Sequence, residues 1–214
     1  VCSSDLLILH YSVYETNKMN QINFKQTKMK KFILLAISVF TLNMATAQTQ
    51  VGEVTLPNSL DFNNETLVLN GAGIRTKLFL KLYSGGLYLP SKTKDAAAII
   101  GADQNQAIQL VITSSFVSSD AMSEAVEDGF EASTRGNTDP FAAEIKTFMG
   151  FFSEDIVEGD TYNITYQTGK GVVCYKNNKE LGSIQGMDFK KALFGIWLGK
   201  NPADSNLKSG MLGK

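Results

Sequence analysis

The order in which strand-like and helix-like segments follow one another constrains the fold of this chain more than any single motif. From 51 to 116 the sequence consists mainly of short strand-like segments, bounded by polar turns, Gly or Pro. Two helical patterns follow, then a hairpin-rich segment over 160–184 and a last helical pattern. Because strands and helices come in groups and do not strictly alternate, we predict an α+β domain with an antiparallel sheet and helices layered on one face.

Local periodicity predicts the individual elements. Met122, Val126 and Phe130 recur at helical spacing in a helix that begins near Ser119. A second helix opens at Asp139-Pro140, since Asp is a preferred N-cap and Pro is favoured at the first helical position. We expect strands at 51–57, 65–71, 77–83 and 106–116, a polar turn at 58–64, a short helix at 95–102, hairpin turns at 168–171 and 177–178, and a last helix from Asp188 that ends at Gly199.

Residues 29–47 have the three parts of a secretory signal peptide. A basic start is followed by an apolar run and by the small-x-small pattern that signal peptidase reads. We expect export to the periplasm or out of the cell, with cleavage after Ala47. An uncleaved N-terminal anchor is the alternative, although the apolar run is short for a bilayer span. Residues 1–28 begin with a segment typical of adapter read-through, so we expect them to be non-native and the folded domain to be 48–214.

The domain at 48–214 lacks the side chains for several kinds of chemistry. The one histidine of the chain is His10, so Ser-His-Asp and Cys-His mechanisms and histidine-ligated metals are excluded, and we predict neither a metal nor a cofactor. Cys174 lies in a strand-like segment, and we interpret it as a packing thiol. The small and unclustered excess of acidic residues argues against a nucleic-acid partner.

The segment NGAGIRTKLFLKLYSGGLYLP, at 70–90, places an arginine between a glycine pair and a run of strand-forming residues. The glycines superficially resemble a dinucleotide-binding loop, but the third glycine is missing and a strand pattern follows where a helix should begin. We interpret Gly71 and Gly73 as relieving steric limits at a strand end or turn. If one strand continues through the segment, alternate side chains share a face of the sheet: those of Arg75, Lys77, Phe79, Lys81 and Tyr83. That face is either solvated or the place where the planar guanidinium of Arg75 clamps a carboxylate.

Three stretches resemble the chalcone isomerase-like family in its secreted bacterial form: VTLPNSL at 54–60, the segment at 70–90, and GIWLGKNPADSNLKSGMLG at 195–213. The resemblance covers essentially all of 51–213. It implies an open-faced β-sandwich, in which a large antiparallel sheet and a helical layer enclose a ligand cleft. This architecture agrees with the α+β domain predicted from the order of segments. The family includes plant enzymes that cyclise chalcones, relatives that bind fatty acids, and non-catalytic helpers.

The resemblance also implies candidate ligand-binding residues. The arginine common to the enzymes and the fatty-acid binders matches Arg75. The next polar site residue, a threonine in the enzymes and a tyrosine in the binders, best matches Tyr83, with Tyr88 as second choice. The enzymes also use a tyrosine and an asparagine in the following helical region, where this chain has Met122 and Gly129. The resemblance therefore implies binding without the isomerase chemistry, and we assign no catalytic residue.

The candidate residues are far apart along a straight strand. Eight residues of strand span about 26 Å, so Arg75 and Tyr83 can contact one ligand only if the chain bends between them, and we place that bend at Thr76–Lys77. A bulge at Gly85–Gly86 would let Tyr88 change to the other face of the sheet.

We therefore expect an exported, non-catalytic protein that binds a fatty-acid-like or other hydrophobic carboxylate. Each buried methylene of such a ligand contributes about 0.8 kcal/mol, and its carboxylate must stay paired when it leaves water. An intramolecular lyase or isomerase of the chalcone isomerase type is the first alternative. A structural or partner-binding domain, with a cleft filled by its own side chains, is the second.

Overall fold

The structure is a computed structural model, and it describes Met19 and residues 48–214. The predictions of a read-through segment and of a signal peptide cleaved after Ala47 concern residues that, apart from Met19, lie outside the described part. None of the helices in that part is long and apolar enough to cross a membrane.

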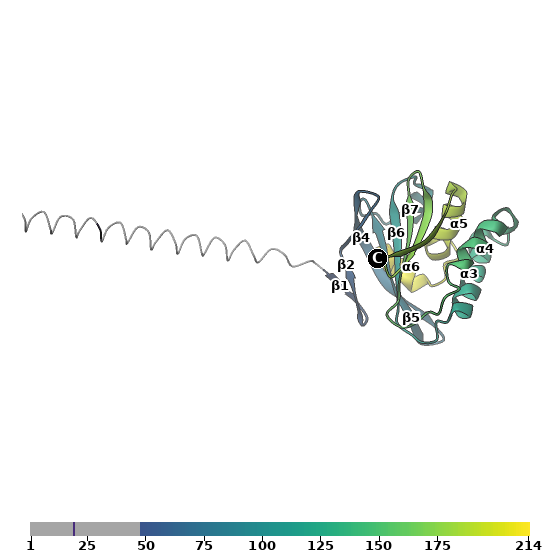
Figure 1. The fold of residues 1–214 in the computed structure, drawn as a ribbon, viewed down its shortest axis with the longest axis horizontal. Coiled ribbons are helices and arrows are strands. Elements are labelled where there is room, and N and C mark those ends of the chain that lie inside the picture. The colour runs from purple at the N-terminus through teal and green to yellow at the C-terminus, as the bar shows by residue number, and fades with distance from the viewer. Residues whose placement is uncertain (1–18, 20–47) are drawn as a thin grey trace, which may run out of the picture. The chain divides into compact units, whose positions relative to one another are not determined.

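Seven strands form one antiparallel sheet in the order β3-β4-β5-β6-β7-β8-β9, so each strand pairs with its neighbours in the sequence. A separate hairpin, β1–β2, precedes them (Figure 1). The strands are β1 (Gln48–Val51), β2 (Val54–Pro57), β3 (Ser59–Phe62), β4 (Glu65–Lys77), β5 (Leu80–Leu89), β6 (Gln106–Ile112), β7 (Thr161–Gln167), β8 (Gly171–Lys176) and β9 (Lys179–Ile184).

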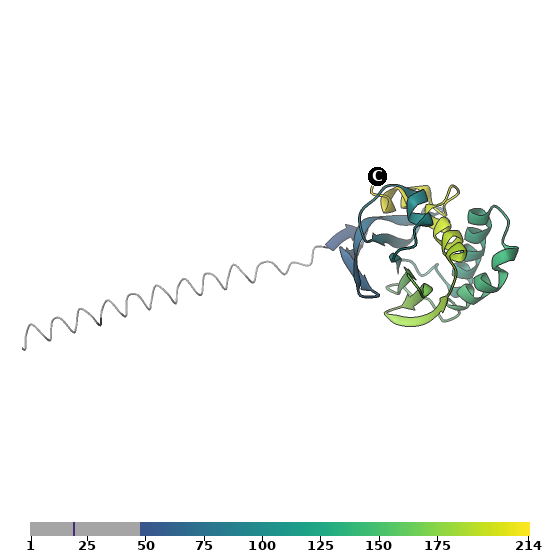
Figure 2. The ribbon, with the colours of Figure 1, turned by 90° about the horizontal axis from the view of Figure 1, so that it is seen from above.

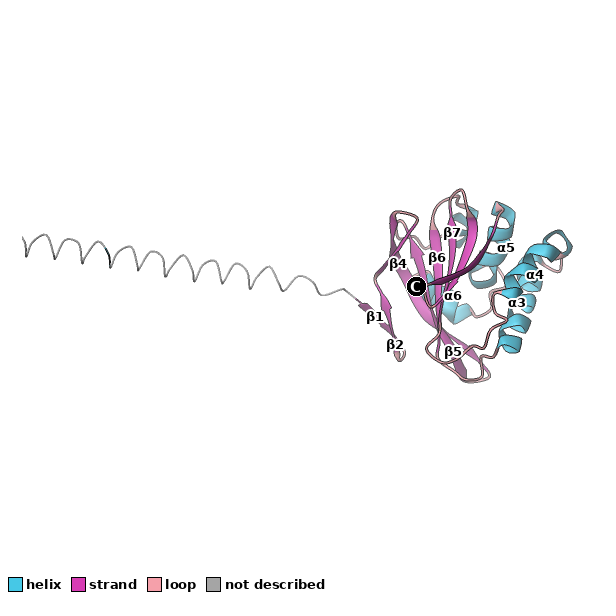
Figure 3. Ribbon diagram, viewed as in Figure 1, coloured by secondary structure: helices cyan, strands magenta, loops and turns pink. Residues whose placement is uncertain are grey.

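The helices lie mainly on one face of this sheet. Figure 3 shows α3, α4 and α5 gathered on one side of the strands and the β1–β2 hairpin on the other. Seen from above, the sheet is curved (Figure 2). The predicted α+β architecture, an antiparallel sheet with a helical layer, is confirmed. The helical elements are α2 (Ala96–Gly101), α3 (Ser119–Thr134), the 3₁₀ turn η2 (Asp139–Phe141), α4 (Ala142–Gly150), α5 (Met187–Leu198) and α6 (Ser205–Met211). Asp139-Pro140 thus opens a 3₁₀ turn, and the α-helix behind it begins at Ala142.

The main core lies between the sheet and the helices. Alternate residues of the central strands, such as Ile108, Leu110 and Ile164, meet the buried face of α5, including Leu193 and Ile196. The opposite face of the sheet buries a smaller cluster of Leu67, Leu69, Tyr88 and Ala107. The two faces therefore have separate apolar interiors, and a residue's strand position decides which one it joins.

The final helix, α6, lies directly on β4 because glycines leave out the side chains at the contact. A Cβ atom on Gly71 would lie 2.2 Å from the Gly210 carbonyl oxygen, and one on Gly85 would lie 2.8 Å from Met211 Cε. Gly71 and Gly85 lie in the interiors of β4 and β5, where the lack of a side chain lets α6 pack closely against the sheet. The prediction that Gly71 and Gly73 relieve steric limits at a strand end or turn is therefore wrong, since both lie inside β4 and face α6. No helix was predicted after Gly199, although Asp204 caps α6 by accepting hydrogen bonds from the backbone N–H groups of two residues that follow it.

The segment predicted as one strand over 77–83 is a hairpin. β4 ends at Lys77, β5 begins at Leu80, and these two residues are paired across the turn. Leu78 and Phe79 form the two-residue loop, with φ angles of 49° and 68°. The bend predicted at Thr76–Lys77 therefore lies two residues further along the chain. Because the chain reverses at the loop, the residues predicted to share one face of a single strand lie on two antiparallel strands: Arg75 and Lys77 on β4, and Lys81 and Tyr83 on β5.

A second hairpin replaces the polar turn predicted at 58–64. Residues 59–62 form β3, and Asn63-Asn64 connects it to β4 with positive φ at both positions. The prediction of a polar loop is wrong here, because Ser59 and Asp61 alternate with the apolar residues of a short edge strand and give it a polar composition.

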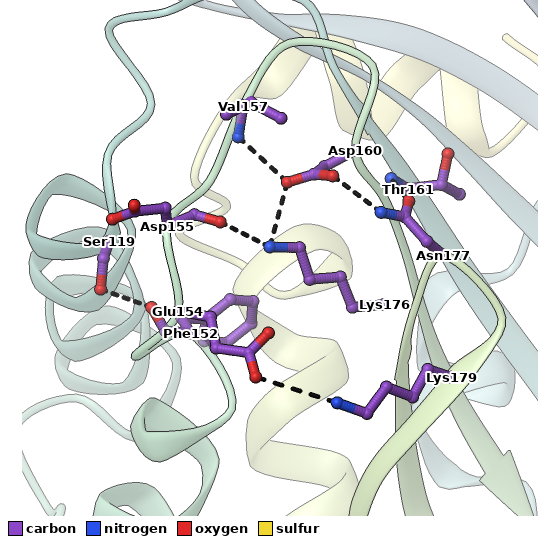
Figure 4. A network of polar contacts seen from close by, with 10 residues as sticks. All are labelled: Ser119, Phe152, Glu154, Asp155, Val157, Asp160, Thr161, Lys176, Asn177 and Lys179. Atoms are coloured by element: carbon purple, nitrogen blue, oxygen red, sulfur yellow. Dashed lines mark hydrogen bonds and ion pairs between the residues drawn. The ribbon is translucent and has the colours of Figure 1, made fainter.

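A polar network fixes the loop between α4 and β7 (Figure 4). Asp160 accepts hydrogen bonds from the Val157 N–H at 3.0 Å and from Asn177 Nδ2 at 2.8 Å, and pairs with Lys176 Nζ at 3.1 Å. Burial alone would raise the pKa of Asp160, but these three donors outweigh it and hold the pKa below the usual value. Ser119, at the start of α3, donates to a carbonyl of the same loop. The network thus holds the helix that forms one wall of the site described next.

Candidate functional site

Arg75 and Tyr83 are brought together by the β4–β5 hairpin. The two residues are cross-strand partners, and Arg75 Nη1 lies 3.4 Å from the Tyr83 hydroxyl, to which it donates. The guanidinium carbon lies 5.7 Å from the centre of the Tyr83 ring. Tyr83 is only 3% exposed, whereas Arg75 is half-buried. Eight residues of straight strand would have separated the two groups, and the two-residue loop removes that separation.

Trp197, on α5, completes a small polar cluster with them. Its indole Nε1 donates to the Tyr83 hydroxyl at 3.0 Å, as a buried indole requires an acceptor. The Tyr83 oxygen thus accepts from Trp197 and from Arg75, which leaves its own hydrogen free to be donated to a third group. No local pattern in the sequence indicates this contact, because 114 residues separate Trp197 from Tyr83.

The charge of Arg75 is not neutralised within the described part of the chain. No carboxylate there lies within 4.0 Å of its guanidinium, and its buried Nε atom has no hydrogen-bond partner among the described residues. An unpaired buried donor costs about 1–3 kcal/mol, and more when it is charged. A carboxylate matches the planar array of guanidinium donors in two parallel hydrogen bonds. Arg75 is therefore arranged to receive an anion.

A cavity of about 210 Å³ opens beside Arg75 and Tyr83. We call it the arginine cavity. It lies between the β4–β5 hairpin, which contributes Leu80 and Leu82, and the start of α3, which contributes Met122. An engineered apolar cavity of about 150 Å³ is enough to bind benzene, so this space accommodates an apolar group of at least that size. Within the described lining, the titratable side chains are those of Arg75, Lys77, Tyr83 and Glu124.

A second cavity, of about 270 Å³, is also lined by Arg75. It is bounded by α3, with the exposed Asp128, and by the segment Asn201–Ala203. Beside it, Asp204 accepts a hydrogen bond from the Thr76 N–H at 3.0 Å, where the pairing of β4 and β5 is irregular. The cap of α6 thereby holds the backbone next to Arg75, so the position of the guanidinium depends on the C-terminal helix.

Tyr88 lies on the opposite face of the sheet from Arg75. The pairing of β4 and β5 is continuous from Gly71–Leu87 to Arg75–Tyr83, so no bulge interrupts the alternation at Gly85–Gly86 and the prediction of one there is wrong. The Tyr88 hydroxyl hydrogen-bonds to the Pro57 carbonyl at 2.9 Å and to Gln109 Oε1 at 3.2 Å. Burial raises its pKa well above the ordinary tyrosine value. The structure thus brings Tyr83, and not Tyr88, to Arg75.

Met122 and Gly129, which match the positions where the family's enzymes have a tyrosine and an asparagine, contribute no polar side chain to the site. Met122 lines the arginine cavity with its thioether side chain. Gly129 lies where α3 packs against α5, and a Cβ atom there would be 2.7 Å from Ile196 Cγ2. An asparagine at this position would therefore force Ile196 to move.

A curved antiparallel sheet with helices on one face defines an open-faced β-sandwich, and in this one an arginine lies at the wall of an apolar cavity. Residues 48–213 match the family model described as chalcone isomerase-like. The chain belongs to the chalcone isomerase-like family.

Among solved structures, the chain is similar to the crystal structure of a fatty-acid-binding protein of Arabidopsis thaliana. The TM-score is 0.61 at 16% sequence identity, and the match covers 78% of this chain and 96% of the plant protein. At this identity the likeness shows a shared fold. The comparison with curated proteins found no significant match.

Proposed function

We propose that this protein binds a fatty-acid-like or other hydrophobic carboxylate in the arginine cavity and does not change it chemically. The observation that carries the proposal is the guanidinium of Arg75, which has no carboxylate partner in the described part of the chain and lies at the wall of an apolar cavity. A ligand carboxylate would pair with Arg75 and accept the free hydrogen of the Tyr83 hydroxyl.

The apolar lining supplies the driving force. Each methylene that leaves water contributes about 0.8 kcal/mol, and the side chains of Leu80, Leu82 and Met122 offer the surface for it. The carboxylate would otherwise lose several kcal/mol on desolvation. A ligand with both parts satisfies the cavity and the charge together, whereas a neutral hydrocarbon leaves Arg75 unpaired.

Two further observations support binding without catalysis. The Arabidopsis protein with the same fold is described as a fatty-acid-binding protein. At the helix positions where the family's enzymes have polar residues, this chain has Met122 and a glycine that contacts Ile196.

The experiment that tests the proposal is native mass spectrometry of the purified protein, followed by lipid extraction and by titration with a series of saturated fatty acids. Arg75→Ala is compared with the wild type. Tyr83→Phe is compared with Tyr88→Phe, which serves as its matched control. The two tyrosine variants lose the same hydroxyl from the same strand, but from opposite faces of the sheet.

We expect Arg75→Ala to weaken acid binding by at least about tenfold, since a hydrogen bond to a charged group contributes about 1.5–3 kcal/mol. Tyr83→Phe should weaken it by a similar factor, and Tyr88→Phe should leave it unchanged. If the wild type is purified empty and binds no added acid, Arg75 is a structural or partner-facing residue and the proposal fails.

We also propose that residues 29–47 direct export and that the protein is a secreted bacterial member of its family. The support is the sequence pattern of a basic start, an apolar run and a small-x-small site. N-terminal sequencing of protein recovered from the periplasm tests this, with Gln48 expected as the first residue. A first residue that precedes the apolar run would contradict it.

A further inference from the structure

The loop between β4 and β5 differs from comparable loops in the same chain. In the described part, three hairpins have two-residue loops with positive φ at both positions. Two of these loops are Asn63-Asn64 and Asn177-Asn178, and asparagine tolerates this conformation well. The third is Leu78-Phe79, which we call the hairpin tip. Positive φ is sterically unfavourable for large apolar residues, so Leu78 and Phe79 make this loop less stable than asparagine would.

Packing does not explain the choice. Leu78 is 82% exposed and Phe79 is 98% exposed, so neither side chain is held by the rest of the domain. Residues kept in costly backbone conformations are concentrated at functional sites. Packing within the described domain therefore does not account for Phe79, and it accounts for Leu78 only as part of the lining of the arginine cavity.

The surroundings of the tip extend its apolar surface. Leu80, at the start of β5, is 42% exposed, and Phe116, in the loop before α3, is 67% exposed. Leu78, Leu80 and Phe116 all line the arginine cavity. Four of the six exposed large hydrophobic residues in the described part thus lie at the tip and at this cavity, the others being Met19 and Val157.

Two lysines flank the tip, and one acid lies across the cavity from it. Lys77 and Lys81 are exposed on the two strands of the hairpin. Glu124, also exposed, is on the α3 wall of the cavity. The strands behind the tip are therefore locally basic, in a domain that has a small excess of acidic residues overall.

We propose that the hairpin tip is a membrane-docking element, which inserts Leu78 and Phe79 into the surface of a phospholipid bilayer. Lys77 and Lys81 then lie at the level of the lipid phosphates, to which their charge is complementary. A specific protein partner usually covers about 800 Å² of each surface, and a protruding two-residue loop offers much less. Insertion into a bilayer requires only a few apolar side chains with basic residues behind them.

Docking in this way places the arginine cavity at the bilayer surface, because the tip and the cavity share Leu78. The inference that a hydrophobic acid passes directly between membrane and cavity rests on the proposed function. The docking itself does not, so the two can fail separately.

The test is co-sedimentation of the mature protein, residues 48–214, with vesicles made of equal parts phosphatidylcholine and phosphatidylglycerol, so that the apolar run of 29–47 does not contribute to binding. Phe79→Asn restores the residue found at the second position of the other two loops, and Phe79→Trp keeps a large apolar ring. Phe79 does not line the arginine cavity, so both variants should bind a soluble fatty acid as the wild type does. The added tryptophan also reports insertion directly, since Trp197 is the one native tryptophan and is buried.

We expect the wild type and Phe79→Trp to sediment with the vesicles, and Phe79→Asn to bind at least about tenfold more weakly. The emission of Phe79→Trp should shift to shorter wavelength on binding and be quenched by lipids brominated in the acyl chain. The double variant L78N/F79N should lose vesicle binding yet unfold at the same or a higher temperature, since both residues then suit the turn.

Two results would overturn the proposal. One is a wild type that stays in the supernatant, or that binds no better than Phe79→Asn. The other is a wild type that forms dimers which Phe79→Asn dissociates, without vesicle binding, because the occupant would then be a second copy of the chain. Arg75→Ala separates docking from ligand binding: it should bind vesicles normally while losing affinity for the acid.

Discussion

The contact between α6 and β4 allows a sharp prediction for Gly71→Ala. The added methyl carbon would lie 2.2 Å from the Gly210 carbonyl oxygen, 2.8 Å from the Gly213 nitrogen and 2.9 Å from the Met211 carbonyl oxygen. All three are backbone atoms, so no side-chain rotation can relieve the overlap. The φ angle of Gly71 is not in the left-handed region, so the effect comes from the contact alone, and α6 must move away from the sheet.

The magnitude follows from what holds α6 in place. Its two buried side chains, Leu207 and Met211, are 1% and 0% exposed, and burying each contributes about 1.5–3 kcal/mol. Asn70 Nδ2 also donates to the Met211 carbonyl at 2.8 Å. Displacement of the helix therefore costs about 3–6 kcal/mol, a large share of the 5–15 kcal/mol that typically stabilises a domain.

The assay is urea unfolding followed by circular dichroism, with Gly101→Ala as the matched control. A Cβ atom on Gly101, at the end of α2, meets nothing within 4 Å. That variant should be neutral or stabilising by about 0.5–1 kcal/mol, as alanine is favoured over glycine in a helix. If Gly71→Ala unfolds within about 0.5 kcal/mol of the wild type, the close packing of α6 on β4 does not stabilise the domain as argued.

Three further predictions concern other buried groups. Asp160→Asn should cost about 2–3 kcal/mol at neutral pH, because it leaves Lys176 without its counter-charge. The folded-state pKa of Asp160 is lowered, so its contribution to the free energy of unfolding is present above about pH 4 and lost as the pH falls. The stabilities of variant and wild type should therefore converge in acid. A difference in stability that stays constant with pH would contradict this. Burial raises the pKa of the Cys174 thiol to about 12, so a thiol reagent should label it no faster than the protein unfolds, and rapid labelling of the folded protein would show it to be accessible. Trp197→Phe removes the indole donor to Tyr83 and should weaken fatty-acid binding several-fold in calorimetry; unchanged affinity would separate Trp197 from the site.

The sequence was sufficient to predict the layers of the fold because these depend on the order of segments. Grouped strand patterns followed by two helices require an antiparallel sheet with a helical layer. The β4–β5 hairpin escaped prediction since its loop is Leu78-Phe79, and turn prediction relies on Gly, Asn and Asp. The helix α6 escaped it because seven residues with two buried apolar side chains give little periodicity.

The residues of the candidate site could be predicted only in part. Arg75 and Tyr83 could be named from the family resemblance, but their distance depended on a turn that composition did not indicate. Tyr88 could be separated from them only by the register of β4 and β5, which fixes its side chain on the opposite face. Trp197 joins the site through a contact between distant segments, and no single sequence encodes such a contact in a local pattern.

The strand order has a consequence for how the domain forms. The strands β3 to β5 and β7 to β9 follow one another through loops of two or three residues, so each group can form hairpin by hairpin with little loop-closure entropy, whereas 16 residues join β5 to β6 and 48 join β6 to β7. The contacts of α6 span more of the chain than any of these connections: the Asn70–Met211 and Thr76–Asp204 hydrogen bonds join residues 141 and 128 positions apart. We expect contacts of such long sequence separation to form late in folding. Weakening them should therefore accelerate unfolding and leave the folding rate nearly unchanged, so the C-terminal helix sets the lifetime of the folded state and of the cavity that depends on it.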